Sequence, residues 1–134
     1  MNIVGIFSVE DGVYIPYRGD AIATAINRIE AADVVVTYNG SIHAGWSDLV
    51  ELGRFGGRPD AIPLKGMHTD MRTVCWSERI WGNSLNNTYT KHFSSCPDFP
   101  DTYEGSNERD VYMTFKLWEL WKQGNLKIID GHEC

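Results

Sequence analysis

The first forty residues constrain the fold most strongly, because they combine a hairpin, a helix and a second strand. The apolar, β-branched run at residues 3–9 is followed by Asp11-Gly12, which is a strong hairpin signal, and then by the alternating segment 13–17. Pro16 indicates that this returning strand lies at a sheet edge. The apolar positions that follow are spaced three and four apart and predict an amphipathic helix capped by Asp20: Ile22, Ala25, Ile26 and Ile29.

A continuous apolar run at residues 34–38 comes directly after this helix. Runs of this kind are typical of parallel strands that are covered on both faces. The order hairpin, helix, strand therefore predicts an α/β domain. We expect the whole chain, residues 1–134, to form that single domain, because its length suits one hydrophobic core.

The remainder of the chain is expected to be mostly helical. Helices are predicted at residues 46–54, 67–81 and 84–93, followed by a proline-containing loop at 94–105. The last helix is expected to be capped by Ser106 or Asn107 and to end at Gly124. Its apolar stripe includes Trp118 and Trp121, which we expect in the core.

Composition excludes several classes of protein. No apolar run approaches the roughly 20 residues that span a bilayer, and no signal peptide is evident at the start, so we expect a cytoplasmic protein without a membrane partner. The net charge of −6 argues against a strong basic footprint for duplex nucleic acid. An odd set of cysteines without a CxxC pair argues against a disulfide framework or zinc ribbon: Cys75, Cys96 and Cys134.

Three motifs occur in a suggestive order. An Asn-Gly pair at 39–40 ends the strand at 34–38, a His-Thr-Asp-Met segment at 68–71 precedes Ser-Leu at 84–85, and Asn-Glu-Arg-Asp-Val at 107–111 opens the last helix. Together they resemble the DEDD 3′–5′ exonuclease family, and most closely the proofreading domains of phage and bacterial family A DNA polymerases. The resemblance implies a ribonuclease H-like mixed sheet with flanking helices.

The resemblance also implies a two-metal site for Mg²⁺ or Mn²⁺, which requires several carboxylate oxygens. In this alignment the chain begins at the family's second strand, so the central first strand and its Asp-x-Glu pair have no counterpart. The sheet would then have to close up, use its own tail, or borrow a strand through a homodimer.

The family's ligand positions are only partly matched. Asp110 matches the third motif and is the candidate metal ligand, whereas Ser106 stands where the family has Tyr or His. His43-Ala44 falls where the family has an aromatic residue and Asp, and Asp48 lies four residues further on. A second register places Glu10 on the first motif. The catalytic candidates are therefore Asp110, Asp48 and Glu10.

Three functions are compatible with this pattern. The leading hypothesis is a domain of exonuclease ancestry that binds single-stranded nucleic acid, with weak or lost hydrolysis. Its candidate contacts combine a base-stacking tryptophan with phosphate-binding cations: Asn39, Trp46, Arg72 and Arg79. One alternative is a small phage-type inhibitor or accessory protein that binds another protein. The other is an active metal-dependent exonuclease whose site a partner chain completes.

Overall fold

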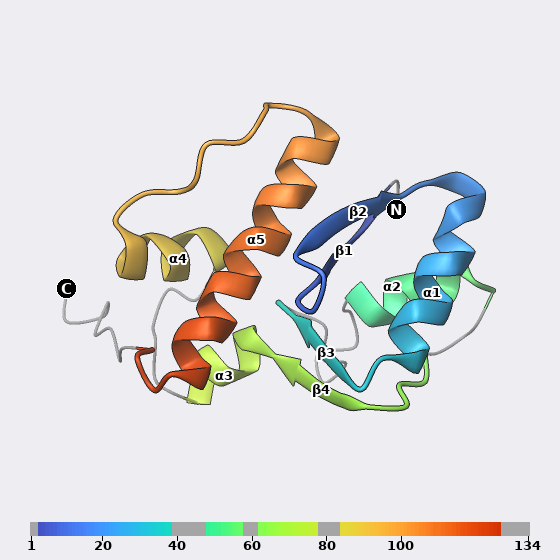
Figure 1. The fold of residues 1–134 in the computed structure, drawn as a ribbon, viewed down its shortest axis with the longest axis horizontal. Helices are drawn as coiled ribbons and strands as arrows, with labels where there is room; N and C mark the ends of the chain where they lie inside the picture. Colours follow the sequence, from blue (N-terminus) through green and yellow to red (C-terminus); the bar gives the residue numbers. More distant parts are fainter. Residues whose placement is uncertain (1–2, 39–47, 58–61, 78–83, 127–134) are drawn as a thin grey trace.

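The computed structural model describes residues 3–38, 48–57, 62–77 and 84–126, and it is a mixed α/β fold (Figure 1). Its elements follow the chain in this order: β1 (Val4–Ser8), β2 (Val13–Tyr17), the 3-10 helix η1 (Gly19–Ala21), α1 (Ile22–Ala31), β3 (Val34–Thr37), α2 (Asp48–Phe55), β4 (Met67–Asp70), α3 (Met71–Ser77), α4 (Leu85–Phe93) and α5 (Tyr103–Lys122). The predicted hairpin, first helix and following strand are all confirmed.

The described strands form two small sheets. β1 and β2 are antiparallel, with Val4 opposite Tyr17 and Ser8 opposite Val13. β3 and β4 are parallel, with Val34 opposite Met67. Among the described residues, no strand of one sheet pairs with a strand of the other. β1 and β3 therefore each have a hydrogen-bonded neighbour strand along one edge, β2 and β4 respectively.

Two helices enclose the hairpin. Val4 and Tyr17 pack with Ile22 of α1 in a first core, to which α2 also contributes. On the opposite face, Phe7 contacts Phe115 of α5 with ring centroids 4.8 Å apart. α5 also contacts β3, and Figure 1 shows this long helix running beside both sheets.

A second core lies between α5 and the helices α3 and α4. It consists of fully or almost fully buried side chains: Met71, Tyr89, Met113 and Leu117. Trp118 and Trp121, which were expected in the core, are partly buried and pack against it. Because α5 contributes to this core and also covers the hairpin, it connects the two halves of the molecule.

Two helix starts differ from prediction. α5 begins at Tyr103, and Thr102 rather than Ser106 or Asn107 caps it, accepting a 2.9 Å hydrogen bond from the Gly105 N–H. At α1, Asp20 does not act as a cap. It lies within η1, where the Ala21 N–H donates to the Arg18 carbonyl at 3.0 Å, and α1 begins directly after this 3-10 turn.

The strand predictions need two corrections. Residues 67–70 form β4 instead of the first turn of a helix, because the Met67 N–H bonds the Asp33 carbonyl at 2.8 Å and joins the segment to β3. β3 itself is not covered on both faces, since Val34 is 51% exposed. The predictions for α4 and for Gly124 are confirmed: Ser84 caps α4, and Gly124 has φ 74° just past the end of α5.

No helix in the described ranges combines the length and apolarity that crossing a membrane requires.

Candidate functional site

Asp110 is the eighth residue of α5, and about half of its side chain is exposed. Arg109 Nη2 lies 3.5 Å from Asp110 Oδ1. Partial burial raises the pKa of Asp110, and the neighbouring Arg109 opposes that rise. The carboxylate therefore faces a guanidinium, and in the described part of the chain no group of three or more His, Cys, Asp or Glu side chains surrounds a common point.

The other two catalytic candidates are not brought to Asp110 by any described contact. Glu10 is exposed in the turn of the β1–β2 hairpin, where the local hydrogen bond joins Ser8 to Asp11 at 3.2 Å. Asp48 is the first residue of α2, and its side chain lies outside the described residues. A two-metal site does not fit the side chains that the structure describes, because no cluster of carboxylates forms around Asp110 among them.

Of the four candidate nucleic-acid contacts, the structure describes Arg72. Arg72 is exposed in the first turn of α3. Asn39, Trp46 and Arg79 lie outside the described residues.

Asn107, from the third motif, holds α5 against the hairpin. Its Oδ1 accepts a 2.6 Å hydrogen bond from the hydroxyl of Tyr14 on β2. Gly5 on β1 makes this approach feasible, because a Cβ there would collide with Asn107 Oδ1 and would lie 2.8 Å from the Tyr14 ring. Burial, together with Glu104 and Glu108, raises the pKa of Tyr14 to about 12, so the phenol remains a donor at neutral pH. The sequence identified Asn107 as a motif residue but gave no sign of this contact, which links positions far apart in the chain.

The second motif has a structural role. Asp70 is buried at the end of β4, and its carboxylate accepts hydrogen bonds from the Arg72 N–H (3.1 Å) and the Thr73 hydroxyl (3.4 Å). This is the geometry of a helix N-cap. Beside it, His68 Nε2 lies 2.8 Å from Thr37 Oγ1, and burial lowers the pKa of His68.

The described cations differ in whether they already have partners. Those around the hairpin and α5 are engaged: Arg18 pairs with Glu104 (2.9 Å), Lys116 with Glu119 (3.2 Å), and Arg28 donates to the Tyr17 hydroxyl (2.6 Å). By contrast, Arg54 at the end of α2 and Lys65 before β4 are exposed and form no ion pair with any described residue.

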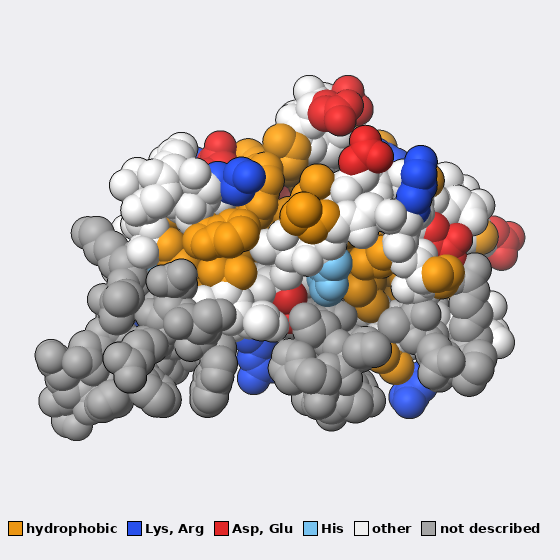
Figure 2. Space-filling model, turned by 90° about the horizontal axis from the view of Figure 1, so that it is seen from below, with side chains coloured by type: hydrophobic (Ala, Val, Ile, Leu, Met, Phe, Trp, Pro, Cys, Tyr) orange, Lys and Arg blue, Asp and Glu red, His pale blue; other side chains and the backbone are white. Residues whose placement is uncertain are grey.

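The spacing of the positive charges is visible on the lower face of the molecule. Among the described residues on this face, Figure 2 shows lysine and arginine side chains as separate spots. The described cations on this face therefore do not form the continuous stripe that a rigid duplex binder carries. The arrangement agrees with the negative net charge of the chain.

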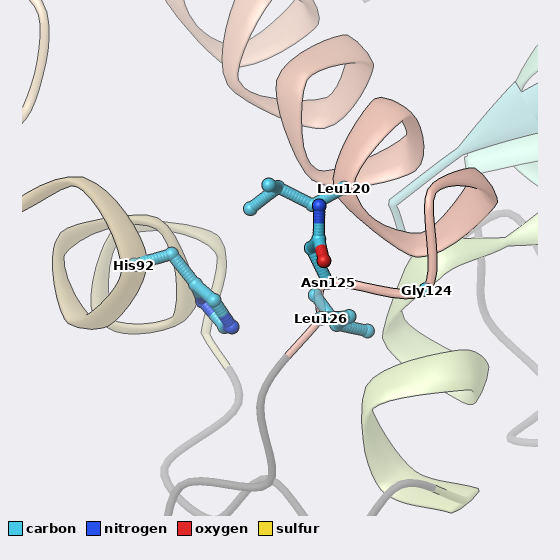
Figure 3. Close-up of a pocket in the computed structure, with 5 residues that line it drawn as sticks. All are labelled: His92, Leu120, Gly124, Asn125 and Leu126. Atoms are coloured by element: carbon cyan, nitrogen blue, oxygen red, sulfur yellow. The ribbon is translucent and has the colours of Figure 1, made fainter.

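Two hollows lie elsewhere on the surface. One, of about 410 Å³, is lined by His92 of α4, Leu120 of α5 and residues 124–126 just past α5, with the ring of His92 facing Leu126 (Figure 3). His92 Nδ1 is engaged there with the Thr88 carbonyl at 2.7 Å. The other, of about 250 Å³, lies where the 97–101 loop meets α5 and includes Arg109, whose buried Nε has no partner in the described structure.

No family model, curated protein or solved structure matches this chain.

Proposed function

We propose that this chain is a domain that binds single-stranded nucleic acid, is of 3′–5′ exonuclease ancestry and has weak or lost hydrolysis. The observation that carries the proposal is the pair of unengaged cations, Arg54 and Lys65, together with the exposed Arg72 on α3. Phosphate contacts by such side chains provide affinity without sequence preference. The ancestry rests on the sequence motifs alone.

The distribution of charge supports binding through Arg54 and Lys65 rather than through the cations that pair with α5. Arg18 and Lys116 already interact with carboxylates of α5, so contact with a phosphate would compete with those ion pairs. Arg54 and Lys65 can contact a phosphate without breaking an ion pair to a described residue. Single-strand binding commonly combines cations like these with aromatic side chains that stack on the bases.

The described carboxylates support weak or lost hydrolysis. Two-metal hydrolysis needs several converging carboxylates, and Asp110 alone, with Arg109 beside it, cannot supply them. An active enzyme would need Asp48, Glu10 or carboxylates of another chain to complete the site, with Mg²⁺ or Mn²⁺ as the metal.

The test incubates the protein with a 5′-labelled single-stranded oligonucleotide in Mg²⁺ or Mn²⁺, and follows both complex formation and product length. We expect a complex whose affinity falls as salt rises, with the oligonucleotide length unchanged. Shortening that requires metal and disappears in Asp110→Ala would instead show an active exonuclease. The absence of a complex at low salt would refute nucleic-acid binding.

One observation favours the protein-binding alternative, a small inhibitor or accessory protein of phage type. The hairpin exposes apolar side chains at Val9 (52%), Val13 (47%) and Ile15 (38%). Exposed apolar groups that lie together mark interaction sites on many soluble proteins. This alternative predicts a protein complex that forms without nucleic acid and is weakened by Val13→Ser together with Ile15→Ser.

A further inference from the structure

The β1 strand has an unused edge, and the pairing register identifies the groups on it. Gly5 lies opposite Pro16, and Phe7 lies opposite Tyr14. Proline has no N–H, so Gly5 and Pro16 cannot form the hydrogen-bonded type of antiparallel pair. Since the two types alternate, β1 bonds β2 through Val4, Ile6 and Ser8. The N–H and C=O groups of Gly5 and Phe7 therefore point away from β2.

These outward groups have no backbone partner among the described residues. The bond that β1 makes outside its ladder is a local one, in which the Ser8 carbonyl accepts from the Gly12 N–H at 2.8 Å. α5 covers a face of the strand and not this edge, because Asn107 approaches the Cβ direction of Gly5 and Phe115 contacts the ring of Phe7. Residues 5–8 are all partly exposed.

The opposite edge of the hairpin is protected. On β2, Pro16 faces the outer edge and has no N–H to donate, and a proline at this position is a common way to prevent further strand pairing. The β1 sequence, Val-Gly-Ile-Phe-Ser, contains neither proline nor lysine. The hairpin thus has one edge that resists a further strand and one that can accept it.

We infer that β1 pairs antiparallel with β1 of a second copy of this chain, about a two-fold axis through Ile6. Gly5 and Phe7 flank Ile6, so this axis places Gly5 opposite the partner's Phe7, and Phe7 opposite the partner's Gly5. The two pairs provide about four backbone hydrogen bonds. The result is a four-stranded sheet in the order β2-β1-β1-β2.

A second copy suits this edge because it removes both open edges at once. The outermost strands of the combined sheet are the two β2 strands, each protected by Pro16. The contact is isologous, and therefore closes at two copies without propagating into a fibre. The interface is small, which predicts a weak, concentration-dependent dimer.

Residue-resolved amide hydrogen exchange tests this pairing, with the protein concentration varied from about 10 µM to 1 mM and the mass followed by light scattering. We expect exchange at Gly5 and Phe7 to slow by about tenfold or more as the dimer forms. The Tyr14 amide, which faces outward on the protected β2 edge, is the matched control and should not change. Added salt should strengthen the dimer, because it screens repulsion between two chains of charge −6.

Three results would overturn the pairing. Exchange at Gly5 and Phe7 that stays fast at every concentration would show an unpaired edge. Exchange that is slow in the monomer would show that the chain covers this edge itself. A dimer that protects Val34 and Val36 would place the interface on β3. Nucleic-acid binding weakens with salt whereas the dimer strengthens, so the two proposals succeed or fail separately.

Discussion

Replacing Gly5 with alanine tests how α5 is attached to the hairpin. The added Cβ would collide with Asn107 Oδ1 and lie 2.8 Å from the Tyr14 ring, so the substitution both overpacks the interface and displaces the 2.6 Å Tyr14–Asn107 hydrogen bond. Overpacking costs about 1–3 kcal/mol and the lost hydrogen bond about 1 kcal/mol. We therefore expect Gly5→Ala to lower the free energy of unfolding by about 2–4 kcal/mol, or the melting temperature by on the order of 10 °C.

A double-mutant cycle makes this prediction specific. Asn107→Ala alone should cost about 1 kcal/mol, but in the Gly5→Ala background it removes the colliding atom and should recover part of the loss. Gly12→Ala is the matched control. Gly12 has φ 68° and no neighbouring atom within 4 Å of an added Cβ, so its cost should add to that of Asn107→Ala without coupling. Urea unfolding measures all the variants. A Gly5→Ala protein within about 0.5 kcal/mol of the parent, or additive costs in the Gly5/Asn107 pair, would refute the reasoning.

Two further predictions concern the second motif. Asp70→Ala should destabilise the protein by about 0.5–2 kcal/mol because α3 loses its cap. Asp70→Asn should cost less, because its amide oxygen can still accept the bond from the Arg72 N–H, although its NH₂ group cannot accept the bond from the Thr73 hydroxyl. Equal losses in urea unfolding would contradict a capping role. Burial lowers the pKa of His68, so the folded state binds the proton less readily than the unfolded state, and stability should fall as the pH drops through the ordinary histidine range. The melting temperature of His68→Gln should accordingly decrease less between pH 7 and pH 5 than that of the parent, and parallel curves would exclude His68 as the cause.

Local signals were sufficient to predict the N-terminal elements. Asp11-Gly12 sets the hairpin, and the apolar spacing sets α1. Ser84 was likewise identifiable as the start of α4, since its hydroxyl accepts from the Asn87 N–H at 3.3 Å. In each case the deciding contacts lie within a few residues, so they leave a pattern that can be recognised in the sequence.

The elements that were predicted wrongly depend on contacts from elsewhere. The Met67–Asp70 segment is a strand because β3 offers a ladder, and Gly66, having no side chain, can lie against the carbonyls of Ala32 and Asp33. The first turn of α5 was missed because Gly105 and Ser106 are weak helix formers. Gly105 is nevertheless required there, since a Cβ would collide with the Pro100 carbonyl of the preceding loop.

The candidate site was predictable only as a list of residues. The sequence singled out Asp110 and Arg72, but the Arg109–Asp110 pair and the unengaged state of Arg54 and Lys65 depend on which carboxylates lie nearby. Side-chain partners of this kind are set by tertiary packing. Periodicity and motif spacing do not encode them.

The salt dependence of single-strand binding tests the central claim most directly. The measurement compares Arg54→Ala/Lys65→Ala with Arg18→Ala/Lys116→Ala, two variants that remove the same charge, by fluorescence anisotropy of a labelled oligonucleotide from about 50 to 200 mM salt. If Arg54 and Lys65 contact phosphates, the first variant should bind more weakly, and its log–log slope should shrink by about 1.4, since each single-strand phosphate contact contributes about 0.7. The second variant should keep the parent slope, because its cations are already paired with Glu104 and Glu119. Equal slopes in both variants would contradict the account.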